Sequence, residues 1–332
     1  MKLSILDQSP ISEGSNAEEA LRNSIDLARH ADRLGYERYW IAEHHGLEMI
    51  ATSAPEIMIA VISQATQRIR VGSGAVLLPH YSPLKVAEVF RTLHALAPGR
   101  IDLGIGRAPG GEGLDALALR RKRDNTPFGD DFPNQVAELT SFLEGTFPDD
   151  HPFQSLRVVP EVVGGPEIWM LGSSMWSGVA AGQYGMPYAF AHFIAPPVTG
   201  EAMEVYRARF LPSPRLAAPR NIVALGVVCG EDDAQAERIA SSMRAISGRI
   251  ARGQQGTVPT IERALAELEE TPYRPPESEW PRLVVGGPKT VRATLEAMAE
   301  AVGIDEIMAL TIVHDHAARV RSYELLAGAF GL

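Results

Sequence analysis

The chain has 332 residues, 45% of them hydrophobic and 22% charged, which is typical of a globular protein. Its formal net charge of −10 argues against nucleic acid as a partner, because an acidic surface repels phosphate backbones. No apolar run approaches the roughly 18 residues that a membrane span needs, and the beginning has no signal-peptide layout. With Cys229 as its single cysteine, the chain has no internal disulfide, so we expect a cytoplasmic enzyme.

Short β-like runs alternate with longer helical patterns along the chain. The predicted strands are residues 2–6, 38–42, 69–78, 101–105, 167–171, 187–190, 222–229 and 306–312. The helical patterns that follow them are residues 18–34, 56–66, 84–96, 135–143, 174–182, 200–210, 233–250 and 317–330. A polar stretch, 107–130, is too rich in glycine, proline and charge to be a strand. Such alternation indicates parallel strands joined by right-handed crossovers.

Eight strand–helix units in a chain of this length predict an α/β fold, a closed (β/α)8 TIM barrel that forms one domain over residues 1–332. A doubly wound open sheet is the alternative. It requires a glycine-rich turn after the first strand to bind a dinucleotide, and residues 7–11 lack one. Residues 252–288 form an insertion before the eighth strand. This insertion is predicted to be either a mobile lid or a surface excursion.

Candidate catalytic residues follow the second strand, because barrel active sites form at the carboxyl ends of the strands. Glu43, His44 and His45 combine a carboxylate with two imidazoles, which suits acid–base catalysis. Neighbours on an extended chain point to opposite faces, so the two histidines would not chelate one metal ion, and no metal site is predicted. The alternative is a purely structural pair, one histidine buried and one exposed.

A phosphate site is indicated after the fourth and fifth strands. Arg107 stands beside small residues, so its guanidinium is free to reach an anion. Ser173 and Ser174 open a helix, whose free amide groups favour an anion. Gly-Ser turns are also common helix caps, so each motif alone says little. Their placement on neighbouring strands is the stronger signal.

Four segments resemble the bacterial luciferase-like flavin monooxygenase superfamily. They are AEHH at 42–45, VGSGAVLLP at 71–79, PGRIDLGIGR at 98–107 and LGSS at 171–174. The ending at 311–319 is similar to one branch, which includes short single-polypeptide members and monooxygenases of polyketide pathways. The resemblance runs from about residue 1 to residue 330, and it is specific for the superfamily but not for a substrate.

The resemblance implies a barrel that binds FMN, delivered in reduced form by a separate flavin reductase. Reduced FMN would react with O2 to a C4a-peroxyflavin, which oxygenates a small organic substrate. A homodimer is also expected from it. His44 matches the functional histidine, with Glu43 and His45 as its neighbours. The cofactor-binding residues that the resemblance implies are Gly74, Ala75, Gly106, Arg107, Gly172, Ser173, Ser174 and Ser177.

Three of these positions carry a further implication. Gly74 and Ala75 match a non-proline cis peptide that packs against the flavin ring in the family. Gly106 stands where luciferase itself has a cysteine, so no thiol role is transferred.

The residues also support a chemical account. A dry pocket would slow the loss of the oxygenated flavin to water, and apolar residues near strand ends are predicted to line it: Leu6, Ile41, Ala75, Leu77 and Ile105. His44 would act there as a base or through a hydrogen bond. Five further residues at strand ends either contact a ligand or serve the structure: Asp7, Gln8, His192, His314 and His316. Asp315 is a candidate helix cap, and Cys229 is predicted to be a small buried residue.

Three other functions remain open. An F420-dependent dehydrogenase belongs to the same superfamily, although residues 43–45 and the ending favour the FMN branch. A non-catalytic flavin-binding subunit would not need His44 and Arg107. A metal hydrolase on the same barrel would need ligands at a spacing that this sequence lacks, and the fold alone does not decide among these functions.

Overall fold

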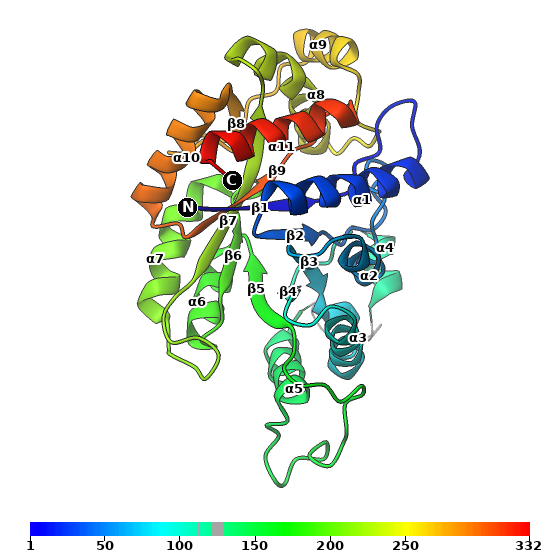
Figure 1. Ribbon diagram of the computed structural model, residues 1–332, viewed down its shortest axis with the longest axis vertical. Helices are drawn as coiled ribbons and strands as arrows, with labels where there is room; N and C mark the ends of the chain where they lie inside the picture. The colour runs from blue at the N-terminus through cyan, green and yellow to red at the C-terminus, as the bar shows by residue number, and fades with distance from the viewer. Residues whose placement is uncertain (112, 121–128) are drawn as a thin grey trace.

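The computed structural model describes residues 1–111, 113–120 and 129–332, so part of the polar stretch 107–130 lies outside the described residues. Parallel strands close into a barrel, in which β9 pairs with both β7 and β1 (Figure 1). In order around the barrel, the strands are β1 (Lys2–Asp7), β2 (Arg38–Ile41), β3 (Arg70–Leu77), β4 (Ile101–Gly106), β5 (Glu167–Gly172), β6 (Tyr188–Ala191), β7 (Asn221–Cys229) and β9 (Glu306–Leu310). The predicted (β/α)8 TIM barrel is confirmed.

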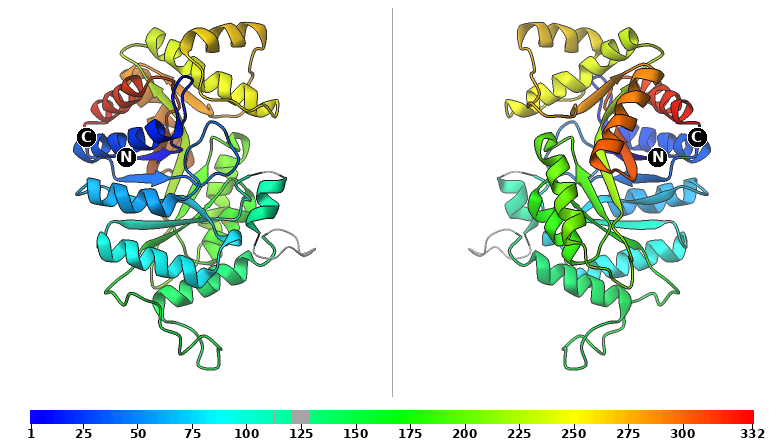
Figure 2. Two further views of the ribbon diagram at one scale, coloured as in Figure 1. Left: turned by 90° about the vertical axis from the view of Figure 1, so that its right-hand side faces the viewer. Right: turned by 90° about the vertical axis from the view of Figure 1, so that its left-hand side faces the viewer.

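Helices cover the outside of the barrel. Figure 1 shows α1, α2 and α3 on one side and α6, α7 and α10 on the other, while both views of Figure 2 place α8 and α9 together at one end. The helices are α1 (Ala17–Leu34), α2 (Pro55–Ala65), α3 (Pro83–Leu96), α4 (Leu114–Leu119), α5 (Phe132–Glu144), α6 (Met175–Gln183), α7 (Thr199–Arg209), α8 (Asp233–Ala251), α9 (Ile261–Glu270), α10 (Pro288–Val302) and α11 (His316–Phe330), with short 3₁₀ turns η1 (Leu78–His80) and η2 (Pro196–Val198). Within the described ranges, no helix is long and apolar enough to cross a membrane.

Side-chain caps set where helices begin. The Asn16 side chain accepts a hydrogen bond from the amide of Glu19 at 2.9 Å, which satisfies a free donor of the first turn of α1. Asp315 does the same for α11, accepting from the amide of Ala318 at 2.7 Å. The predicted cap at Asp315 is therefore confirmed.

Two apolar layers arise because successive residues of a strand face opposite sides. Trp40 of β2 and Trp169 of β5 meet edge to face, with ring centroids 5.4 Å apart, although their strands are not neighbours, so both rings fill the barrel interior. Ile41 and Ile105 belong instead to the cluster that packs against the helices. The prediction that these two residues line a pocket is wrong, because they lie on the outer face of their strands.

One strand, β8, and two helices, α4 and α10, were not predicted. β8 (Leu283–Gly286) pairs in parallel with the carboxyl end of β7 and takes no part in closing the barrel. It belongs to the insertion 252–288, which also contains α9. The helix α10 then leads back to β9.

A network of charged side chains fills the floor of the barrel, where the strands begin. This floor network consists of Arg38, Arg70, Asp102, Glu167 and Glu306. The Arg38 guanidinium donates to Asp102 at 2.9 Å through Nη1 and to Glu306 at 2.8 Å through Nε. The Asp102 carboxylate also accepts from Trp40 Nε1 at 2.9 Å. One buried cation thereby joins the starts of β2, β4 and β9.

Replacing Asp102 by alanine leaves Arg38 buried with fewer counter-ions. We expect Asp102→Ala to lower the free energy of unfolding by about 3–5 kcal/mol, as for other broken buried ion pairs. Glu262→Ala is the matched control, because it removes one carboxylate from the exposed pair with Arg238 and should cost about 1 kcal/mol or less. Urea denaturation of both variants at pH 7 measures the difference, and equal effects would show that the floor network does not stabilise the barrel.

Candidate active site

A cavity of about 1020 Å³ lies at the carboxyl ends of the barrel strands, the end where TIM-barrel enzymes carry their active sites. Loops that follow β1, β2, β4 and β6 form one part of its wall, together with the end of β9, and α8 and the insertion form the rest. Three of the predicted residues lie in this wall: Gln8, His44 and His45. The described lining includes none of the five apolar residues that were expected there.

His44 lines this cavity and has one ring nitrogen without a partner among the described residues. Its Nδ1 is buried and has no hydrogen-bond partner among the described residues. Burial lowers the pKa of His44 to about 4, and the neighbouring charge of His45 adds to the shift. The imidazole is therefore neutral at pH 7, when it can either donate or accept one hydrogen bond to a ligand.

Glu43 lies behind the cavity wall and ties the ends of β2 and β3 together. Its buried carboxylate accepts from the amide of Leu77 at 3.0 Å, from the Tyr81 hydroxyl at 2.7 Å and from His45 Nε2 at 2.9 Å. The first acceptor is Oε2 and the other two share Oε1. The hydrogen bond between His45 Nε2 and the Glu43 carboxylate fixes the His45 ring. Glu43 therefore sets the orientation of that imidazole and does not contact a ligand itself.

Tyr81 and His80 belong to the same cluster, and sequence reasoning assigned them no role. Burial, followed by the charge of Glu43, raises the pKa of Tyr81, so its hydroxyl stays a donor. His80 Nε2 donates to the carbonyl of Pro109 at 2.8 Å, and the rings of His45 and His80 stand nearly perpendicular at 6.3 Å. The sequence signal that could have identified His80 and Tyr81 is their position directly after the third strand.

Arg107 stands at the end of β4 and is exposed. Its guanidinium lies over the ring of Trp176, 4.1 Å from the centroid, a cation–π contact that leaves its N–H groups available. No carboxylate of the described residues is paired with it. Trp176 itself packs edge to face on Phe132.

The turn before α6 brings small residues close together. A Cβ at Gly172 would lie 2.3 Å from Ser177 Oγ, so only glycine fits where β5 meets the helix. The Ser177 hydroxyl donates to the carbonyl of Ser174 at 2.7 Å and lies 2.9 Å from the Tyr188 hydroxyl. Since this hydroxyl is used internally, the groups left for an anion are those of Ser173 and Ser174 and the free amides of the helix.

The peptide bond between Gly74 and Ala75 in β3 is cis, as the resemblance implies. It lies between the histidines that follow β2 and the candidate anion-binding groups that follow β4 and β5. A Cβ at Gly74 would come within 2.8 Å of Leu6 Cδ1, so its backbone lies against the barrel interior. A Cβ at Gly106 would lie 3.3 Å from Ala75 Cβ on the neighbouring strand. The pairing order β2, β3, β4, β5 therefore sets His44, the cis peptide, Arg107 and the Ser174 turn side by side along one arc of the rim.

The remaining candidates serve the structure. Asp7 is fully buried and binds Arg319 Nη2 at 2.6 Å, so it does not reach a ligand. His314 Nε2 donates to the carbonyl of Glu13, and His316 contacts Asp26, away from the described cavity lining. Cys229 is buried, as predicted. Within the ranges that the structure describes, no three His, Cys, Asp or Glu side chains form a metal-ligating group.

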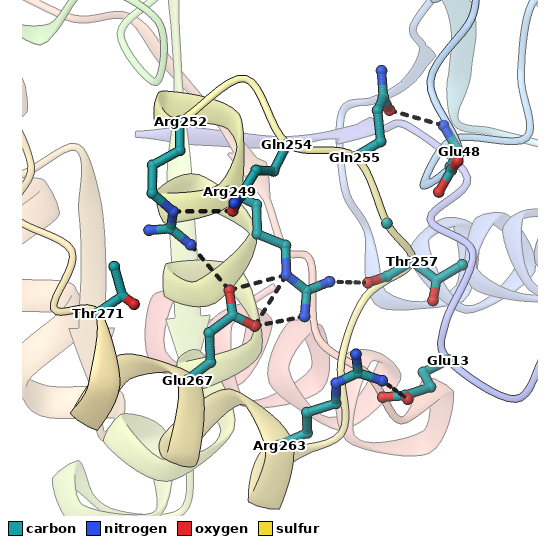
Figure 3. A pocket seen from close by; sticks show the side chains of 11 residues that line it. Glu13, Glu48, Arg249, Arg252, Gln254, Gln255, Thr257, Arg263, Glu267 and Thr271 are labelled. Carbon is teal, nitrogen blue, oxygen red and sulfur yellow. Dashed lines mark hydrogen bonds and ion pairs between the residues drawn. The ribbon is translucent and has the colours of Figure 1, made fainter.

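The insertion is fixed to the barrel by its first part. Figure 3 shows Arg249 binding both Glu267 and the carbonyl of Thr257, the latter at 3.0 Å, beside the ion pair of Arg263 with Glu13. The amide of Val258 donates to the carbonyl of Ile11 at 2.9 Å, in the loop after β1. Residues 271–282 follow without helix or strand and border the cavity. The insertion therefore supplies one anchored and one irregular segment.

Comparison with known proteins identifies the family of this chain. The model of the luciferase-like monooxygenase family matches residues 1–306. A luciferase-like monooxygenase of Escherichia coli (strain K12) is 38% identical over 327 residues, which cover 97% of this chain and 95% of that protein. The crystal structure of apo-MsnO8 is 47% identical, with a TM-score of 0.92, over 100% of this chain and 98% of the other.

More distant structures show the fold alone. The oxygenating constituent of 3,6-diketocamphane monooxygenase from Pseudomonas putida, solved in complex with FMN, has a TM-score of 0.74 at 20% identity, over 98% and 96% of the two chains. An F420-dependent secondary alcohol dehydrogenase has a TM-score of 0.71 at 14% identity, over 99% and 98%. The barrel, the rim arc and the match over most of the sequence lead to one conclusion: this chain is an oxidoreductase that belongs to the luciferase-like monooxygenase family.

Proposed function

We propose that this chain is an FMN-dependent monooxygenase that takes reduced FMN from a separate flavin reductase and uses O2 to oxygenate a small organic substrate. The observation that supports this most is the rim arc, in which a neutral histidine, a cis peptide, a free guanidinium and a helix start follow one another on neighbouring strands. That order suits an elongated ligand with a flat ring at one end and a phosphate at the other.

The residues present fit FMN. Arg107, Ser173, Ser174 and the amides that open α6 would hold its phosphate, because an anion is stabilised at a helix N-terminus and by a guanidinium. The backbone of Gly74 and Ala75, with Gly106 beside it, offers a surface without bulky side chains for the ring. When bound, reduced FMN supplies the two electrons that activate O2.

The chain's own residues would do the rest. His44, neutral at pH 7, would hold or move one proton through its imidazole next to the reacting centre. Glu43 would keep His45 in place through the hydrogen bond to Nε2. The apolar part of the cavity wall would exclude water, which slows the unproductive release of hydrogen peroxide. The lid role of residues 252–288, the single domain, the homodimer and the cytoplasmic location stay predictions.

His44 is the first residue to test. Anaerobic protein is mixed with reduced FMN and then given a pulse of O2, while flavin absorbance and released hydrogen peroxide are recorded. We expect slow reoxidation in the wild type and, in His44→Ala, reoxidation faster by about 10²-fold, within the usual range for one acid–base group. His314→Ala is the control, because that imidazole binds the Glu13 carbonyl outside the described cavity lining.

The same experiment separates the other functions. Tight binding of FMN without slow reoxidation would indicate a dehydrogenase or a carrier subunit. Failure to bind reduced FMN would contradict the proposal, and F420 would then be the cofactor to test.

Arg107 should discriminate FMN from riboflavin, which lacks the phosphate. We expect Arg107→Ala to weaken FMN binding about tenfold or more, since a charge-assisted hydrogen bond contributes about 1.5–3 kcal/mol. Riboflavin affinity should not change. Fluorescence titration of both flavins measures this, and an equal loss for the two ligands would place the phosphate elsewhere.

Neutral His44 also makes stability depend on pH. An unfolded histidine has a pKa of about 6.5, whereas the folded pKa is about 4, so the unfolded chain binds more protons between these values. Stability contributed by this residue is therefore lost as pH falls from about 6.5 to about 4. We expect His44→Gln to flatten the pH dependence of the free energy of unfolding in that window, and urea denaturation from pH 4 to pH 7 tests it. An unchanged slope would mean that His44 is not buried in its neutral form.

A further inference from the structure

Arg282 is a cation without an ionic partner in the wall of the candidate active-site cavity. It precedes β8 in the insertion, and its Nη1 donates to the Tyr273 hydroxyl at 2.8 Å. No carboxylate of the described residues lies within 4.0 Å of its guanidinium, although Glu277 lines the same cavity. The other arginines of this wall differ, because Arg244 is paired with Glu237 and Arg249 with Glu267.

The backbone that carries Arg282 is held in place from two sides. Its carbonyl accepts from the amide of Gly226 in β7 at 3.1 Å. The preceding carbonyl, of Pro281, can only accept, so His192 Nε2 donates to it at 3.1 Å, and His192 Nδ1 then accepts from the Thr199 hydroxyl at 2.7 Å. Burial lowers the pKa of His192, which keeps the imidazole in the neutral form that this arrangement needs.

The cavity that Arg282 borders also carries apolar side chains. The residues that β6, α8, β8 and β9 bring to the cavity include Phe193, Ile194, Met243, Ile246, Leu283, Leu310 and Ile312. A cation in such surroundings is stabilised by an anion that binds through charge-assisted hydrogen bonds. A planar carboxylate can accept two N–H bonds of a guanidinium at once.

We propose that the substrate of this enzyme is an organic acid, whose carboxylate binds Arg282 and Tyr273 while its apolar body occupies the cavity. This inference rests on the proposed monooxygenase function, which it makes more specific. A single guanidinium with one hydroxyl matches a monoanion, whereas a phosphate dianion would call for more donors than the described wall supplies here. Arg107 and the α6 turn offer the phosphate site at the other part of the rim.

The test uses acids and their neutral amides as probes: octanoate against octanamide, and 4-phenylbutyrate against 4-phenylbutyramide. Calorimetric titration of the full-length protein, with and without FMN, measures each affinity. We expect the acids to bind about tenfold more tightly than the amides or better, the difference that a charge-assisted hydrogen bond makes. Equal affinities, or no binding of the acids at millimolar concentration, would overturn the proposal.

Variants test whether Arg282 causes the preference for acids over amides. Arg282→Gln should abolish the preference for acids, and Tyr273→Phe, which keeps the ring, should reduce it by a smaller factor. Arg244→Gln is the matched control, because it removes the same charge from the same wall at a site already neutralised by Glu237. A preference that survives in Arg282→Gln, or disappears in Arg244→Gln, would contradict the assignment.

FMN binding distinguishes this inference from the proposed function. Arg282→Gln should bind FMN as the wild type does, which also shows that the variant is folded. Weakened FMN binding with an intact preference for acids would make Arg282 a flavin ligand and leave the monooxygenase proposal standing. If the wild type bound no FMN, the monooxygenase proposal would fail, while the comparison of acid and amide would still decide whether Arg282 forms a carboxylate site.

Discussion

The architecture depends on one buried cation, the Arg38 guanidinium in the floor of the barrel. Burial alone would lower the pKa of Arg38, but the charges of Asp102 and Glu306 outweigh burial and raise it, so the cation persists. Its hydrogen bonds reach the first residues of strands that are not neighbours in the sheet. Because a one-residue slip would turn these side chains to the opposite face, the floor network helps to set the register of the whole barrel. The opposite rim is positioned by that register.

At the rim, strand pairing decides which chemical groups meet. Neighbouring strands place the Glu43 cluster, the cis peptide of Gly74 and Ala75, and Arg107 next to one another. The pairing of β2, β3 and β4 therefore brings these groups together. The hydrogen bonds of Glu43 to Leu77 and Tyr81 then lock the ends of β2 and β3 together. His44, which lines the cavity, is neutral because burial lowers its pKa, and no carboxylate of the described residues contacts its ring. The site is thus rigid where it would hold a flavin ring.

The sequence predicted the barrel because each of its strands is followed by a helix long enough to show a 3.6-residue period. It did not predict which face Ile41 and Ile105 present, since strands that are apolar on both sides carry no alternation. Glu43 and His44 were predicted as candidates from their place at a strand end. The partners that give them their properties, such as Tyr81, and the unpaired state of Arg282, depend on contacts between distant parts of the chain. Such contacts leave no local pattern in one sequence.

The insertion has an anchored half and an irregular half, and this division separates two kinds of evolutionary change. Residues near Val258 are hydrogen-bonded to the loop after β1, so substitutions there disturb the barrel itself. The stretch 271–282 has no regular secondary structure and still forms part of the cavity wall. Related proteins could therefore exchange this stretch and acquire new substrates, while the floor, the rim arc and the stability of the barrel stay the same.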